Sequence, residues 1–118
     1  HALAIVTSKL ARGATKSLEF IGIADCFSAV VGLESTTKHK PGPEPVWHAL
    51  ERLGGSAPSR ALFVGDSTHD MHAGRAAGVI TGAALWGPYT REELAPTAPD
   101  HWLAGMDEVV PLVRRLAV

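Results

Sequence analysis

Apolar runs and helical periods alternate along nearly the whole chain. Short continuous apolar runs predict four buried strands, over residues 2–6, 29–33, 61–64 and 79–85. Apolar residues spaced three or four apart predict helices between and after them, over residues 11–21, 45–53, 71–77 and 106–116. A helical turn near residues 91–94 and a small strand at 101–103 complete the pattern. Such alternation is typical of a parallel sheet covered on both faces, so we predict an α/β fold, a three-layer Rossmann-like parallel sheet.

Polar residues with useful chemistry stand where the predicted strands end. Thr7 follows the first strand, Lys40 lies in a proline-containing loop over residues 35–43, and Asp66 follows the strand at 61–64. The carboxyl ends of parallel strands meet at one edge of the sheet, and ligands of open α/β folds bind there. We therefore expect these three residues to come together at a single site.

Asp66 and Asp70 form the first candidate group. Asp66 projects from a strand end, and Asp70 lies near the first turn of the next helix. Two carboxylates at this place suit Mg²⁺, which keeps several waters and takes one or two protein carboxylates together with substrate phosphate. The alternative is structural: Asp66 caps the helix and Asp70 is a solvated acid in its first turn.

Lys40 and Thr7 are candidates for holding a phosphoryl group. Pro41 disfavours helical geometry at Lys40, which places this lysine on an extended loop, where its compact charge can neutralise a phosphate. The Thr7 hydroxyl and the backbone amides of Ser8 and Lys9 can form a small cradle for an anion. In isolation, an ordinary exposed lysine and a helix N-cap threonine explain the two residues equally well.

The order of these segments resembles the haloacid dehalogenase superfamily of phosphotransferases, within it the phosphoglycolate phosphatase and pyrophosphatase branch. Residues 6–9 resemble the second motif of that branch, although asparagine is more usual where Ser8 stands. Residues 40–45 resemble the third motif and residues 64–79 the fourth, and Trp86-Gly87 matches a common Trp-Gly pair. The resemblance extends from about Ala2 to Leu112.

The resemblance implies a role for each candidate residue. Thr7 would bind the phosphoryl oxygens, with help from the Ser8 amide, and Lys40 would hold the phosphate and the charge of the nucleophile. Asp66 would bind Mg²⁺. Asp70 would bind the cation more weakly, through water, or would orient Lys40.

The first motif of the family, Asp-x-Asp-x-Thr, has no counterpart in the chain, and neither has the helical cap that follows it in the family. The remaining aspartates, Asp25, Asp100 and Asp107, do not end long apolar strands. In the family the nucleophile strand lies between the strands that end here at Thr7 and Asp66, so its loss would leave both neighbours with unpaired edges. We expect residues 1–118 to be a partial core domain, inactive alone, from a longer protein.

In the intact protein the resemblance implies Mg²⁺-dependent hydrolysis of a phosphate monoester or of pyrophosphate through an aspartyl-phosphate. The alternative is a non-catalytic module that retains the fold and binds phosphate or a partner. A receiver-like signalling domain also uses aspartate, threonine and lysine, but it needs a different order of these residues. The substrate within the phosphate class stays open, because the cap that selects it is absent from the chain.

The composition limits the partners that we expect. Lysine and arginine number 11 and aspartate and glutamate 12, which gives no basic surplus for nucleic acid and no charged block for a membrane surface. We expect a small phosphorylated substrate, and the missing N-terminal segment of the chain itself, as partners. The single cysteine, Cys26, is expected to be a buried thiol and fits a reducing, cytoplasmic setting. His69 and His72 lack the further clustered ligand that zinc requires; we expect His69 to face solvent, with contact to substrate as the alternative.

Overall fold

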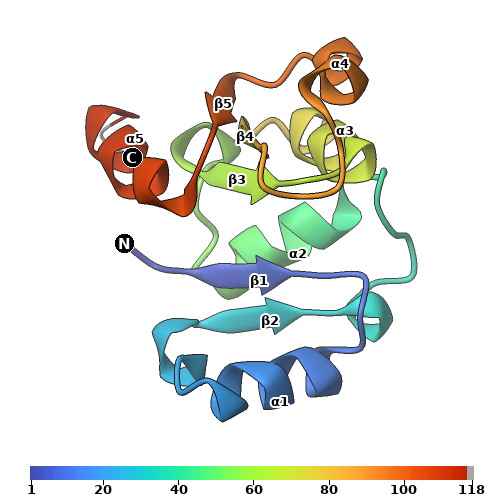
Figure 1. Cartoon of the computed structure of the whole chain (residues 1–118). Helices are drawn as coiled ribbons and strands as arrows, with labels where there is room; N and C mark the ends of the chain where they lie inside the picture. Colours follow the sequence, from blue (N-terminus) through green and yellow to red (C-terminus); the bar gives the residue numbers. More distant parts are fainter. Residues whose placement is uncertain (117–118) are drawn as a thin grey trace.

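Short parallel strands form the centre of the computed structural model, which describes residues 1–116 (Figure 1). The strands are β1 (Ala4–Val6), β2 (Ala29–Val31), β3 (Leu62–Gly65), β4 (Ile80–Ala84) and β5 (His101–Leu103). They pair in two separate sheets, one with the order β1-β2 and one with the order β3-β4-β5. Every pairing is parallel, with Ala4 opposite Ala29, Leu62 opposite Ile80 and Gly82 opposite His101.

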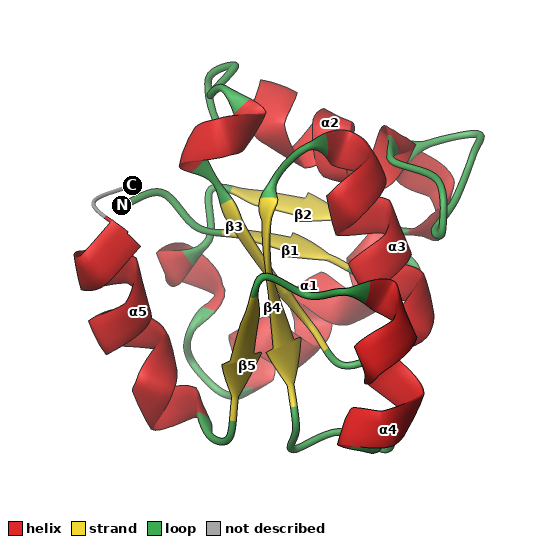
Figure 2. Ribbon diagram, turned by 90° about the horizontal axis from the view of Figure 1, so that it is seen from above, coloured by secondary structure: helices red, strands yellow, loops and turns green. Residues whose placement is uncertain are grey.

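Helices cover the strands and connect the two sheets. The α-helices are α1 (Ala11–Phe20), α2 (Glu44–Arg52), α3 (Thr68–Ala77), α4 (Arg91–Leu94) and α5 (Val109–Leu116). Single 3₁₀ turns occupy Ala24–Cys26, Leu33–Ser35, Pro58–Arg60, Ala95–Thr97 and Met106–Glu108. Helix α2 contacts both strands of the first sheet and also α3, which contacts β3 and β4. Figure 2 shows α1 and α2 on opposite sides of β1–β2, and α5 on the side of β5 away from α3. The predicted three-layer α/β fold is confirmed.

Two clusters of buried apolar side chains hold α3 to its neighbours. One joins α2, α3 and the start of β4, and the other joins α3, β4 and α4. Their buried members are Val46, Leu50, Ala73, Ala77 and Val79 in the first and Met71, Ala83 and Leu94 in the second. The indole Nε1 of Trp47 donates to the carbonyl of Ala77 at 3.2 Å, which ties α2 to the end of α3. Helix α3, which follows Asp66 and carries Asp70 in its first turn, is therefore anchored on several sides.

The observed elements follow the sequence prediction with small shifts. Helix α3 begins at Thr68, three residues before the expected start, because Ser67 caps it and the polar first turn belongs to the helix. The expected helix over 106–116 is divided into a 3₁₀ turn and α5. Gly78 ends α3 with φ of 83°, the left-handed conformation in which glycine is favoured.

Cys26 is a correction to the sequence prediction. We expected a buried thiol, but its side chain is exposed on the 3₁₀ turn that follows α1. This turn buries none of its three residues, whereas the neighbouring Phe27 is half-buried. Apolar neighbours in the sequence did not predict the burial of Cys26, because a short turn has no regular alternation of buried and exposed positions.

The gap between the two sheets is the main departure from a continuous parallel sheet. β1 has β2 as its strand partner and β3 has β4, so within residues 1–116 one backbone edge of β1 and one of β3 face no strand. Figure 1 shows β1 and β3 as neighbours across this gap, with their arrows pointing the same way. No helix within the same residues is long and apolar enough to cross a membrane.

Candidate active site

The carboxyl end of β1 presents Thr7. Its amide donates to the carbonyl of Val31 at 2.9 Å, which continues the β1–β2 ladder by one residue. Its hydroxyl accepts a hydrogen bond from the Lys9 amide at 3.1 Å, while Ser8 is exposed at the bend of the chain. Helix α1 begins after Leu10 without a side-chain cap, so the interpretation of Thr7 as a helix N-cap is wrong. The Thr7 hydroxyl instead closes a tight turn beyond the strand.

Lys40 is held in the loop between β2 and α2. An imidazole nitrogen of His39 lies 2.7 Å from the carbonyl of Leu33, and the Gly42 amide donates to the His39 carbonyl at 2.9 Å, which folds the loop back on itself. Glu44 and Pro45 then begin α2, as the sequence predicts. The Lys40 ammonium lies 2.6 Å from Oδ1 of Asp70, and both side chains are almost buried, with 11% and 12% of their area exposed. Lys40 is thus not an ordinary exposed lysine.

The turn between β3 and α3 arranges the two aspartates differently. The Asp70 amide donates to the Ser67 hydroxyl at 3.1 Å, which makes Ser67, and not Asp66, the cap of α3. Oδ2 of Asp70 accepts from the Asp66 amide at 3.2 Å, and Oδ1 binds Lys40. Asp70 is therefore a buried acid with both oxygens engaged, which excludes the alternative of a solvated first-turn residue.

The Asp66 carboxylate has a different environment from that of Asp70. Asp66 is half-buried, and within residues 1–116 its side chain accepts no hydrogen bond and forms no ion pair. Asp66 lies one residue beyond β3. Its amide donates to Oδ2 of Asp70, whose other oxygen binds the Lys40 ammonium. A half-buried carboxylate that has no partner among the described residues is available to a ligand that they do not supply.

Two glycines make room for the two carboxylates. A Cβ atom on Gly65 would overlap the side chain of Asp70, coming within 2.8 Å of its Cγ and its Oδ2. A Cβ atom on Gly87 would lie 2.5 Å from Cβ and 2.6 Å from Oδ2 of Asp66. The chain that follows β4 therefore passes directly against Asp66. The sequence singled out Gly87 only as half of a Trp-Gly pair and Gly65 only as part of the turn and the fourth motif.

The structure brings some of the predicted site residues together directly. Lys40, Asp66 and Asp70 form one connected group through the ion pair and the hydrogen bond to the Asp66 amide. Thr7 and Ser8 follow β1, whose arrow points the same way as that of β3 in Figure 1. Within residues 1–116 they form no hydrogen bond with the lysine and the aspartates, and β1 is in a different sheet from β3. Their part in a shared site stays a prediction.

The unpartnered carboxylate of Asp66 fits a hard cation held by few protein ligands, whereas both oxygens of Asp70 are already engaged. Within residues 1–116 no group of three or more histidine, cysteine, aspartate or glutamate side chains is placed to enclose a metal ion. Mg²⁺ tolerates such a site, because water and substrate phosphate complete its octahedral shell. The space that Gly87 leaves for the free carboxylate of Asp66 is consistent with that use. His69 is exposed, as expected, and so is His72.

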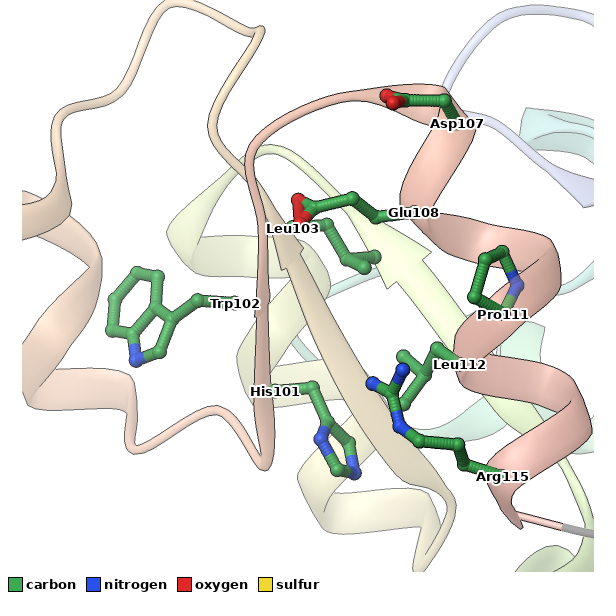
Figure 3. Close-up of a pocket in the computed structure, with 8 residues that line it drawn as sticks. All are labelled: His101, Trp102, Leu103, Asp107, Glu108, Pro111, Leu112 and Arg115. Carbon is green, nitrogen blue, oxygen red and sulfur yellow. The ribbon is translucent and has the colours of Figure 1, made fainter.

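A separate pocket lies between β5 and α5 (Figure 3). It has a volume of about 300 Å³, and the side chains of His101 and Arg115 point into it, while Trp102 points to the other side of β5. None of the residues that sequence reasoning selected lines it. The pocket is therefore distinct from the lysine–aspartate group.

Comparison with known proteins gives consistent matches. The family model described as haloacid dehalogenase-like hydrolase matches residues 1–84. The pyrophosphatase PpaX of Bacillus velezensis is 39% identical over 110 residues, which are 93% of this chain and 50% of the relative. The phosphoglycolate phosphatase of Aquifex aeolicus is 38% identical over 111 residues, which are 94% of this chain and 50% of that protein.

A solved structure supports the same relationship. The crystal structure of a "predicted phosphoglycolate phosphatase" from Haemophilus somnus superposes with a TM-score of 0.86 at 28% identity, over 95% of this chain and 49% of that one. The chain spans about half the length of the curated relatives it matches.

Proposed function

The chain belongs to the haloacid dehalogenase-like hydrolase family, and from this premise we propose that it is the phosphate- and cation-holding part of a phosphohydrolase. One observation carries the proposal: the Asp66 carboxylate has no partner within residues 1–116, and the amide of the same residue is hydrogen-bonded to the nearly buried Lys40–Asp70 ion pair. A lysine ammonium and an unpartnered carboxylate within one hydrogen-bonded group at the end of a parallel strand match the two needs of a phosphoryl group and its metal. The names of the relatives, pyrophosphatase and phosphoglycolate phosphatase, point to the same chemistry.

Each residue then has a distinct task. Lys40 neutralises charge on the phosphoryl oxygens, and Asp70 fixes the direction of the ammonium through the 2.6 Å contact. Asp66 binds Mg²⁺, which screens the phosphate charge when it is present. Thr7 and the Ser8 amide bind phosphoryl oxygens from the side of β1.

The reaction also needs a nucleophile that these residues do not supply. A carboxylate must attack phosphorus as the bond to the leaving oxygen breaks, an acid must give that oxygen a proton, and water must then release phosphate from the carboxylate. Asp100, whose carboxylate accepts from the Thr81 amide at 2.8 Å, is engaged between β4 and β5. Asp25 and Asp107 lie on 3₁₀ turns outside the group. In our proposal the nucleophile comes from a strand that fills the gap between β1 and β3 and completes the sheet.

The proposed setting follows from the same features. The substrate is a small phosphate monoester or pyrophosphate, and we expect neither nucleic acid nor a membrane as a partner. A cytoplasmic location suits a chain with one cysteine and no disulfide-forming pair.

The test compares the 118-residue chain with a longer form that carries the polypeptide preceding His1 in the encoding gene. We expect Mg²⁺-dependent release of phosphate from a panel of small phosphate esters and pyrophosphate by the longer form alone. Lys40→Ala and Asp66→Asn in that form should each lower kcat/KM by at least about 100-fold, as expected for groups that stabilise developing charge. Phosphate release by the 118-residue chain would contradict the proposal. Phosphate binding by both forms without turnover would favour a non-catalytic module.

A further inference from the structure

Gly87 lies where the chain leaving β4 passes the carboxyl end of β3. The Leu85 amide still donates to the Leu103 carbonyl at 2.9 Å, so the strand direction continues beyond β4 before the chain turns. Two residues later the backbone of Gly87 meets Asp66, and an added Cβ would lie 2.5 Å from its Cβ, 2.6 Å from Oδ2 and 2.8 Å from Cγ. Three side-chain atoms of Asp66 thus occupy the space that a side chain at position 87 would need.

Glycine is required at position 87 for space. The glycines with positive φ are Gly22, Gly54, Gly55 and Gly78, so the backbone of Gly87 lies outside the left-handed region. A residue with a side chain could therefore adopt its backbone conformation without strain. What excludes a side chain at this position is the proximity of Asp66.

A rotation of the Asp66 side chain cannot relieve this overlap. Rotation about χ1 would move the carboxylate oxygens, but Cβ is bonded to the backbone and stays in place. A methyl group at position 87 would therefore push apart the two backbone segments, the turn after β3 and the chain after β4. Because the Asp66 amide is also tied to Asp70 at 3.2 Å, the displacement would change the position of the carboxylate relative to Lys40 and Asp70.

We propose that Gly87 is the positioning residue for the Asp66 carboxylate. Within residues 1–116 no hydrogen bond orients that carboxylate, so packing against the Gly87 backbone is the contact that limits where it points. The expected effect of this contact rests on the proposed function: if Asp66 binds the cation, a displaced Asp66 carboxylate binds it less tightly. Trp86-Gly87 therefore belongs to the cation site through its backbone.

The first measurement tests the contact itself through thermal unfolding of the 118-residue chain. Gly87→Ala should lower Tm by about 5 °C, the order expected when a methyl group is forced into a filled space. Gly87→Ala should lower Tm by the same amount in the Asp66→Asn background, because asparagine retains the Cβ atom. In the Asp66→Gly background, where residue 66 has no Cβ atom, Gly87→Ala should leave Tm unchanged. Gly13→Ala is the matched control, because a Cβ at that helical position meets no atom within 4 Å. It should leave Tm unchanged or raise it.

The second measurement tests the consequence through Mn²⁺ binding, followed by the electron paramagnetic resonance signal of the free ion. Mn²⁺ is used as the probe because it shares the preference of Mg²⁺ for octahedral oxygen ligands. Gly87→Ala should raise the Kd for Mn²⁺ about tenfold while circular dichroism confirms that the variant is folded. Asp66→Asn should weaken binding at least as much, and Gly13→Ala should bind as the unaltered chain does.

The outcomes separate this inference from the function on which it rests. An unchanged Tm and Kd for Gly87→Ala, or an equal Tm loss in the Asp66→Gly background, would overturn the positioning role. Equal Kd values for Mn²⁺ in the unaltered chain and in Asp66→Asn would instead show that Asp66 does not bind the cation. The Tm comparison would then still decide whether Gly87 fixes that side chain.

Discussion

At the scale of single residues, the Lys40–Asp70 pair is the group whose removal we expect to have the largest effect. Both side chains are nearly buried, and Asp70 has its two oxygens bound to the Lys40 ammonium and the Asp66 amide. Taking two charges out of water is costly, so such a pair adds little stability by itself, but loss of one partner leaves the other uncompensated. The pair therefore constrains the site more than it stabilises the fold.

Lys40→Ala should lower the free energy of unfolding by about 3 kcal/mol, because it leaves the Asp70 carboxylate buried without its cation. Urea unfolding of the chain measures this change. The control is Lys38→Ala, two residues earlier, where the side chain is exposed and forms no ion pair with any residue from 1 to 116; it should change stability by less than about 0.5 kcal/mol. Equal effects of the two substitutions would show that the Lys40 contact contributes nothing.

Single site residues could be predicted from the sequence where their position relative to a neighbouring strand was enough to identify them. The candidates Lys40, Asp66 and Asp70 could be selected from their positions after strands, and the alternative that Asp70 orients Lys40 matches the observed contact. The role of Gly87 could not be predicted, because it depends on how closely two chain segments separated by 20 residues approach each other. The prediction that Cys26 is buried was wrong for a related reason: on an irregular turn, buried residues do not recur at a regular spacing that the sequence would reveal.

At the scale of elements, the start of α3 determines how the site is presented. Ser67 accepts from the Asp70 amide, so the same hydrogen bond that caps the helix also fixes the backbone of a site residue. Further along the helix, Gly74 allows α3 to approach the sheet, because a Cβ there would lie 2.8 Å from Cγ2 of Thr81 and 2.9 Å from Cδ2 of Phe63. The cap and the glycine together set how α3 carries Asp70 toward Lys40.

Ser67→Ala should lower the free energy of unfolding by about 1 kcal/mol through loss of the cap. It should also shift the NMR signal of the Asp70 amide, which loses its acceptor. Ser56→Ala serves as the comparison, because Ser56 is exposed and its side chain forms no hydrogen bond within residues 1–116. A Ser67→Ala variant as stable as Ser56→Ala would contradict the assignment of the cap.

Element types were predictable because apolar periodicity is strong in this chain, whereas boundaries moved by a few residues. The early start of α3 was missed because Thr68, His69 and Asp70 are polar and lie outside the apolar repeat. Caps and first turns are polar by nature, since they satisfy free backbone amides. They are recognised from capping residues and not from periodicity.

At the scale of the whole molecule, two sheets are joined by packed helices and not by strand pairing. Helices α2 and α3 contact each other and reach both sheets, and the Trp47–Ala77 hydrogen bond reinforces that contact. The sequence could predict a parallel α/β fold but not this division, because the pairing of strands depends on backbone geometry that apolar runs do not encode. The resemblance to a known family, and not the periodicity, indicated which edges would be open.

Hydrogen exchange can test the open edge of β1. The Thr7 amide is bonded to Val31, and because successive amides of a strand point to opposite edges, the Val6 amide faces the gap. Val6 should therefore exchange its amide hydrogen at least about tenfold faster than Thr7 in the 118-residue chain. In the longer form, where we propose a strand in the gap, Val6 should become protected. Equal protection of the two amides in the 118-residue chain would mean that the edge is already covered.

The open edges also affect how the 118-residue chain behaves at high concentration. Each unpaired edge is a template for a strand from another molecule, and here two such edges, on β1 and β3, face one gap. Neither strand carries a lysine or a proline that would oppose such pairing. Concentrated samples should therefore self-associate and precipitate more readily than those of the longer form, so solubility itself becomes a measure of whether the sheet is complete.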